Sequence, residues 1–163
     1  MRASLATILG ADLAGADALV MAAAVADYRP NAASNVKIKK SAGSGPPTIA
    51  FAENPDLIAE IGARRTGARP VLVAFALETG DDATVLGYAR KKLAAKKVDF
   101  VVANAAHESL WKTTNRVAIV GADDASPFVS AGKDTIADLI VDRVAAQILR
   151  STLAALGSSQ PLR

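Results

Sequence analysis

The chain alternates between continuous apolar runs, typical of strands covered on both faces, and segments whose apolar residues recur at helical spacing. This pattern predicts strands over residues 16–25, 48–52, 69–79, 98–106, 115–121 and 127–130. It predicts helices over Ser4–Gly15, residues 53–65, Ala83–Lys97 and Asp134–Leu156. In the second of these helices we expect Asn54 as the N-cap and Pro55 at the first helical position.

The order of these elements predicts the fold class. Strands alternate with helices long enough for crossover connections, so we expect an α/β fold with a mostly parallel sheet and helices on both faces. The last two strands indicate an antiparallel hairpin at an edge. Residues 31–52, rich in glycine, serine and proline, are expected to form a surface flap or a hairpin extension. We expect one domain over residues 1–156 and a frayed tail over 157–163.

Composition narrows the functional classes. The 163 residues include no cysteine, which excludes disulfides, thiol nucleophiles and thiolate metal sites. The formal charge is only +3, and the basic residues cluster in "NVKIKK" and "YARKKLAAKK". Such local clusters favour a phosphorylated small molecule over a nucleic acid, which needs a broader basic face. No apolar run is long enough to span a membrane, and we expect a cytoplasmic location.

Two groups of lysines are candidates for binding an anion. Lys92 and Lys96 fall one turn apart on one face of a predicted helix, where a triphosphate between them would relieve their repulsion. Alternatively, they interact with the dipole at the end of that helix. Lys37, Lys39 and Lys40 could close over an anion or a partner chain, or form an ordinary solvated run.

Further candidates stand where predicted strands end, which is where open parallel sheets bind ligands. The stretch "MAAAVADYRP" indicates a strand that leads into a polar cluster. Asn104, at the end of "VVAN", could contact a ligand or cap a turn. Trp111 could stack on a base or cover the open end of the core. His107 is the only histidine, which excludes a site with several histidine ligands. The absence of G-x-G-x-x-G disfavours an NAD-dependent reductase.

The ordered segments "AAAVADYRP", "KIKK", "ENPDLIAEI", "FALET" and "ARKKLAAKKVDFVVAN" resemble the phosphopantothenoylcysteine synthetase domain of coenzyme A biosynthesis, over roughly residues 5–150. The resemblance implies a Rossmann-like fold, a homodimer, and CTP-dependent ligation of 4'-phosphopantothenate with cysteine through an acyl-cytidylate, accompanied by Mg²⁺. It also implies a flavin-dependent decarboxylase domain, fused or associated. Such chemistry needs charge neutralisation and positioning more than a nucleophile or a base.

The resemblance also implies roles for individual residues. Lys92 matches the family's lysine that contacts the triphosphate and supports the first half-reaction. "AFALET" stands where the family has "GFAAET", so Ala74 and Leu77 replace a glycine and an alanine. The implied nucleotide-binding residues are Phe75, Ala76, Lys92, Lys96, Asn104 and Trp111. The implied substrate-binding residues are Ala23, Ala24 and Asp27, and the flap residues are Lys37, Lys39 and Lys40. No magnesium ligand is singled out, although Asp81 and Asp82 are available.

The sequence departs from the family at its front. Family domains begin with a strand, a "GGT"-type glycine-rich loop and a later "SNxSSGxMG" segment, and neither motif occurs here. We therefore expect a chain that lacks about one βαβ unit and is incomplete for catalysis unless that segment is supplied. The uncovered sheet surface would favour dimerisation or aggregation. The alternative function is a non-catalytic dimerisation or assembly module derived from the same domain.

Overall fold

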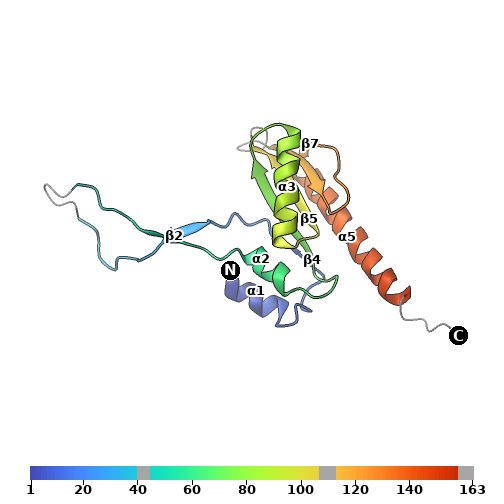
Figure 1. The fold of residues 1–163 in the computed structure, drawn as a ribbon, viewed down its shortest axis with the longest axis horizontal. Coiled ribbons are helices and arrows are strands. Elements are labelled where there is room, and N and C mark those ends of the chain that lie inside the picture. Colours follow the sequence, from blue (N-terminus) through green and yellow to red (C-terminus); the bar gives the residue numbers. More distant parts are fainter. Residues whose placement is uncertain (40–44, 107–112, 158–163) are drawn as a thin grey trace. The chain divides into compact units, whose positions relative to one another are not determined.

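The computed structural model describes residues 1–39, 45–106 and 113–157. The helices are α1 (Arg2–Leu9), α2 (Leu57–Arg64), α3 (Asp82–Lys96) and α5 (Lys133–Gly157). The strands are β1 (Ala18–Val20), β2 (Tyr28–Pro30), β3 (Phe51–Glu53), β4 (Val71–Glu78), β5 (Phe100–Ala105), β6 (Thr114–Val120) and β7 (Val129–Gly132). The chain divides into two compact units: a main unit, Met1–Ala22 with Leu57–Arg163, and a hairpin unit, Ala23–Asp56 (Figure 1).

The main unit is built on a five-stranded sheet with the strand order β1-β4-β5-β6-β7. β1, β4 and β5 run parallel, and β6 and β7 continue the sheet in antiparallel pairs. These pairings confirm the α/β class and the closing antiparallel hairpin at the edge of the sheet. α3 and α5 lie within two residues of their predicted bounds. None of the helices in the described ranges is both long and apolar enough to cross a bilayer.

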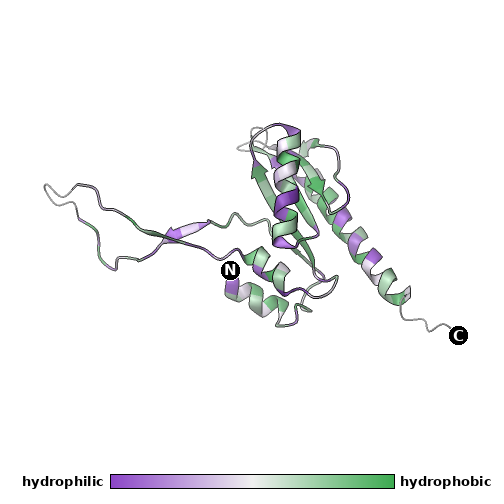
Figure 2. Cartoon of the chain, viewed as in Figure 1, coloured by the Kyte–Doolittle hydropathy of each residue, from purple (hydrophilic) through white to green (hydrophobic). Residues whose placement is uncertain are grey.

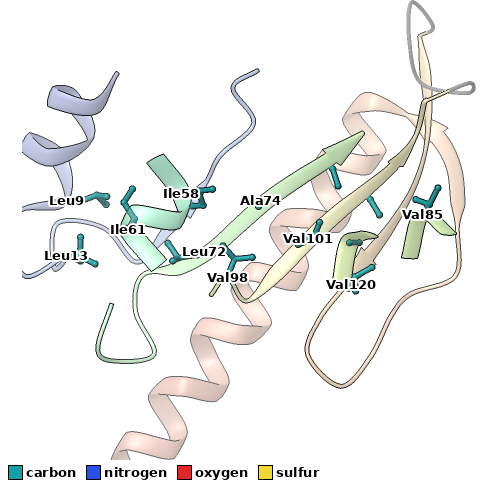
Figure 3. Packing of buried hydrophobic residues seen from close by; sticks show 13 residues of the cluster. Leu9, Leu13, Ile58, Ile61, Leu72, Ala74, Val85, Val98, Val101 and Val120 are labelled. Carbon is teal, nitrogen blue, oxygen red and sulfur yellow. The ribbon is translucent and has the colours of Figure 1, made fainter. Parts of the chain in front are cut away.

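Two buried clusters cover opposite faces of this sheet, because successive residues of a strand point to opposite sides. One cluster joins Leu72, Ala74 and Val101 to residues of α1, α2 and α3 (Figure 3). The other joins Val71, Val73 and Val102 to Ile136, Ile140 and Val144 of α5. Helices therefore cover both faces, as predicted. The strands between them are hydrophobic along most of their length (Figure 2).

The strand predicted over residues 16–25 is much shorter than expected. Only Ala18–Val20 pairs with β4, and Ala22–Val25 are exposed. The last ladder contact is the Met21 N–H, which donates to the Val73 carbonyl at 2.9 Å. The prediction was wrong because alanine side chains bury too little apolar area to hold an edge segment in the core.

The hairpin unit contains β2 and β3, which pair antiparallel, and it includes the residues predicted as a flap. The Asn54 side-chain nitrogen donates to the Ala26 carbonyl at 2.8 Å, and its Oδ1 accepts from Arg29 at 3.0 Å. α2 begins only at Leu57. The predicted N-cap and the start at Pro55 are therefore wrong, because the Asn54 carboxamide closes the base of the hairpin instead.

α1 is also shorter than its prediction. The helix ends at Leu9, and Gly10 follows with φ 74°, a left-handed value that favours glycine. The predicted end of the helix at Gly15 is therefore wrong, because Gly10 ends it earlier.

Candidate functional site

β4 presents an unpaired backbone edge at its carboxyl end. On the β1 side, the ladder ends where Met21 bonds to Val73. The alternation of the strand turns the backbone N–H and C=O of Phe75 and Leu77 to this same side. No strand in the described ranges pairs with them there. These groups can bind a planar ligand that offers both a donor and an acceptor.

The two predicted nucleotide-binding residues of β4 point to opposite faces. Phe75 is half-buried and packs against the cluster on the α5 side. Ala76 is 1% exposed and lies in the cluster on the α3 side. A ligand beside β4 can therefore reach the backbone of this segment, whereas the methyl group of Ala76 belongs to the core.

Lys92 of α3 reaches the last residue of β4. Its Nζ lies 2.9 Å from Oε1 of Glu78, and the two side chains are 36% and 21% exposed. Glu78 is a residue that the sequence analysis missed. Its place at the end of a buried strand, followed by a turn, is the signal that could have found it. The pair puts one cation and one anion, both accessible to solvent, at the carboxyl edge of the sheet.

Lys96 has different surroundings from Lys92, although both lie on α3. A Cβ atom added at Gly62 of α2 would lie only 2.0 Å from the Lys96 carbonyl oxygen. The last turn of α3 therefore packs closely on α2. Both lysines lie on α3, as predicted, and Lys92 forms an ion pair with Glu78 of β4. That the two lysines share a triphosphate stays a prediction.

Asn104 lies on β5, opposite Leu77 of β4 and opposite Val117 of β6. Strand alternation places its side chain on the α5 face with Val102, whereas Glu78 and Lys92 lie on the α3 face. Oδ1 of Asn104 is buried and accepts no hydrogen bond within the described part of the chain. An unpaired buried acceptor costs roughly 1–3 kcal/mol. A ligand that contacts both Asn104 and Lys92 must pass around the carboxyl edge of the sheet.

Two carboxylates at the start of α3 already have partners. Asp81 is the N-cap and accepts from the Thr84 N–H at 2.8 Å; hydrogen bonds from the Thr84 side chain and backbone lower the pKa of Asp81. Hydrogen bonds from Arg116 lower the pKa of Asp82. Among the described residues, no three His, Cys, Asp or Glu side chains gather in a way that could hold a metal ion. These residues do not form a magnesium site of their own.

The predicted substrate-binding residues belong to the hairpin unit. Ala23, Ala24 and Asp27 are all exposed. The Asp27 carbonyl accepts from the Asn54 N–H at 2.7 Å, which fixes the backbone at this point. The side chains are thus available to a ligand, and their role stays a prediction.

Of the remaining predicted residues, two lie within the described ranges and two lie outside them. Lys37 and Lys39 are exposed residues of the hairpin unit. Lys40 and Trp111 lie outside the described residues, as does His107. The proposed roles of the flap lysines and of the aromatic residue stay predictions.

Comparison with known proteins identifies the family. The model of the DNA/pantothenate metabolism flavoprotein C-terminal domain matches residues 3–148. The chain belongs to this family. The coenzyme A biosynthesis bifunctional protein CoaBC of Mycobacterium bovis is 41% identical over 137 residues, which cover 79% of this chain and 32% of that protein. The protein of the same name from Vibrio parahaemolyticus is 47% identical over 88 residues, or 54% of this chain and 21% of its own length. The family resemblance found in the sequence is confirmed.

Solved structures confirm the Rossmann-like α/β architecture of the family. The DNA/pantothenate metabolism flavoprotein from Streptococcus pneumoniae matches with a TM-score of 0.58 and 22% identity, covering 75% of this chain and 59% of that chain. A mutant of Cab2 in complex with phosphopantothenate-cysteine matches with a TM-score of 0.50 and 18% identity, covering 66% of this chain and 34% of that one. The chain thus spans about a fifth to a third of the two curated relatives and up to about three fifths of these structures.

Proposed function

We propose that the chain, together with the front segment of its family, ligates 4'-phosphopantothenate to cysteine with consumption of CTP, as a step of coenzyme A biosynthesis. One observation in this member of the family carries the proposal. The open backbone segment of β4 is followed directly by Glu78, which contacts the solvent-accessible Lys92. The relatives support it, since they are named for coenzyme A biosynthesis, and the Cab2 structure holds phosphopantothenate-cysteine.

The proposed reaction has two steps. A carboxylate oxygen of 4'-phosphopantothenate attacks the α-phosphorus of CTP, pyrophosphate leaves, and an acyl-cytidylate forms. The amine of cysteine then attacks the acyl carbon, and CMP leaves with the former carboxylate oxygen. Neither step requires a nucleophile from the protein. The first step concentrates negative charge, which the Lys92 ammonium would stabilise.

The open edge of β4 would hold the base. A backbone carbonyl of Phe75 or Leu77 would accept from the exocyclic amine of cytosine, and a backbone N–H would donate to an acceptor on the ring. Backbone recognition tolerates the replacement of the family's glycine and alanine by Ala74 and Leu77. Adenine also carries an exocyclic amine and ring acceptors, so these backbone contacts alone do not explain the proposed preference for CTP over ATP.

The remaining assignments follow the predicted roles. Asn104 would contact the nucleotide from the α5 side of the sheet, and Ala23, Ala24 and Asp27 would bind 4'-phosphopantothenate. Mg²⁺ would neutralise phosphate charge when bound, and it would arrive on the triphosphate because the described residues offer no cage for it. A homodimer, and a fused or associated flavin-dependent decarboxylase domain, complete the proposed assembly.

The test is product formation with a choice of nucleotide. The complete gene product and the 163-residue chain are incubated with 4'-phosphopantothenate, cysteine, Mg²⁺ and either CTP or ATP, and the product is measured by mass spectrometry. We expect product with CTP, little with ATP, and a loss of about a hundredfold or more for Lys92→Gln. Lys91→Gln, at an exposed position of the same helix, is the matched control. We expect turnover from the complete gene product and none from the 163-residue chain alone. Absence of product from both proteins, with either nucleotide, contradicts the proposal and favours the assembly module.

A further inference from the structure

The partner of Lys92 suggests a residue whose role the family resemblance does not assign. We propose that Glu78 is a positioning residue, which holds the Lys92 ammonium where the triphosphate of the nucleotide binds. This inference rests on the proposed function. It is carried by the 2.9 Å contact between Oε1 of Glu78 and Nζ of Lys92.

Both ends of this contact are anchored in rigid elements. Glu78 ends β4, where it is in register with Ala105 of β5, and the strand before it is almost wholly buried. Lys92 lies on α3, which is held to the sheet by the buried Val85 and Ala89. A free lysine side chain samples many rotamers, and fixing it costs up to about 2 kcal/mol. Glu78 supplies this ordering before the nucleotide binds.

The pair leaves binding capacity on the lysine. An ammonium group has three donors, and a single carboxylate contact uses one of them. The other acidic side chains near the start of α3, Asp81 and Asp82, are held by Thr84 and Arg116. Glu78 is therefore the carboxylate that acts on Lys92 directly, and two donors remain for phosphate oxygens.

Positioning competes with repulsion, because the carboxylate of Glu78 also repels a triphosphate. Glu78→Gln removes both effects, and the kinetic constants separate them. If positioning dominates, kcat falls more than KM for CTP rises, since the ordered ammonium matters most where negative charge grows in the transition state. If repulsion dominates, KM for CTP falls and kcat is kept.

The kinetic test uses the complete gene product. We expect Glu78→Gln to lower kcat about tenfold to hundredfold, with KM for CTP within about threefold. Glu78→Asp, which keeps the carboxylate, should recover part of the loss. Glu60→Gln is the matched control, because it breaks a solvent-exposed ion pair with Arg2 elsewhere in the main unit. Unchanged kcat in Glu78→Gln, or a fall in KM alone, overturns the inference and leaves the proposed function intact.

A second readout does not depend on turnover. Lysine acetylation by an N-hydroxysuccinimide ester, mapped by mass spectrometry, reports how freely each ammonium group is exposed. We expect Glu78→Gln to raise the labelling of Lys92 relative to Lys91, which lies near the Tyr88 ring instead. Equal labelling of Lys92 in the two proteins overturns the inference. A weaker apparent affinity for Mg²⁺ without a change in labelling also overturns it, because Glu78 would then act on the metal. Failure of the unmutated protein to turn over overturns the proposed function, and the inference with it.

Discussion

Arg116 of β6 donates two hydrogen bonds to the carboxylate of Asp82, at 2.6 and 2.8 Å, and so joins the antiparallel half of the sheet to the first turn of α3. Its guanidinium also lies over the Phe128 ring, 4.3 Å from the centroid. We expect Arg116→Lys to lower the thermal unfolding midpoint, because an ammonium group cannot reproduce the planar two-point contact. Arg90→Lys, at an exposed position of α3, is the control. Equal midpoints for both variants would contradict this account of Arg116.

The cap of α3 predicts a pH dependence. Hydrogen bonds hold the pKa of Asp81 below its ordinary value of 3.8 in the folded protein. Its contribution to stability is therefore complete above pH 3.8 and is lost as the pH falls through the lower folded-state pKa. We expect Asp81→Ala to destabilise the protein at neutral pH, and the difference from the unmutated protein to shrink in acid. Denaturant unfolding at pH 7 and well below pH 3.8 measures this, and a difference independent of pH would refute it.

Two glycines give opposite expectations for the same substitution. A Cβ at Gly62 would meet the Lys96 carbonyl at 2.0 Å, so Gly62→Ala must push α2 away from α3 and should cost about 1–3 kcal/mol. A Cβ at Gly87, inside α3, would meet nothing within 4 Å, so Gly87→Ala should stabilise the helix by up to about 1 kcal/mol. Urea unfolding of both variants checks the signs. Destabilisation by both to the same extent would contradict the close packing of α2 on α3.

The loss of stability on truncating a leucine should depend on how deeply its side chain is buried. Leu72 of β4 is fully buried in the cluster on the α3 side of the sheet, so Leu72→Ala should cost about 2–5 kcal/mol. Leu149 of α5 is 61% exposed, so Leu149→Ala should change stability by no more than about 0.5 kcal/mol. Comparable losses in the two variants would show that Leu149 is buried in solution, which contradicts its exposure on α5.

The elements of the main unit were predictable where apolar side chains are large. β4 and β5 match their predictions because their branched and aliphatic runs can be satisfied only in a covered sheet. The strand predicted through Ala22–Val25 is absent there because alanine suits buried and exposed sites alike. The prediction of Asn54 as an N-cap was wrong because a short polar side chain can cap a helix or close a hairpin, and tertiary structure decides between the two.

The candidate site was predictable only in part. Lys92 could be placed on a helix and Asn104 near the end of a strand, since strand ends and helix faces follow from periodicity. Their separation on opposite faces of the sheet depends on strand pairing, which no local pattern contains. The same holds for the open backbone edge at Phe75 and for the contact with Glu78, which joins residues 14 positions apart.

The acyl-cytidylate is the central intermediate of the proposed function. Its most direct test uses 4'-phosphopantothenate labelled with oxygen-18 in the carboxylate, incubated with the complete gene product, CTP, Mg²⁺ and cysteine. We expect one labelled oxygen in CMP and none in pyrophosphate, because the oxygen that attacks the α-phosphorus leaves with the nucleotide. Label in inorganic phosphate or pyrophosphate, or product formed with unlabelled CMP, would contradict it.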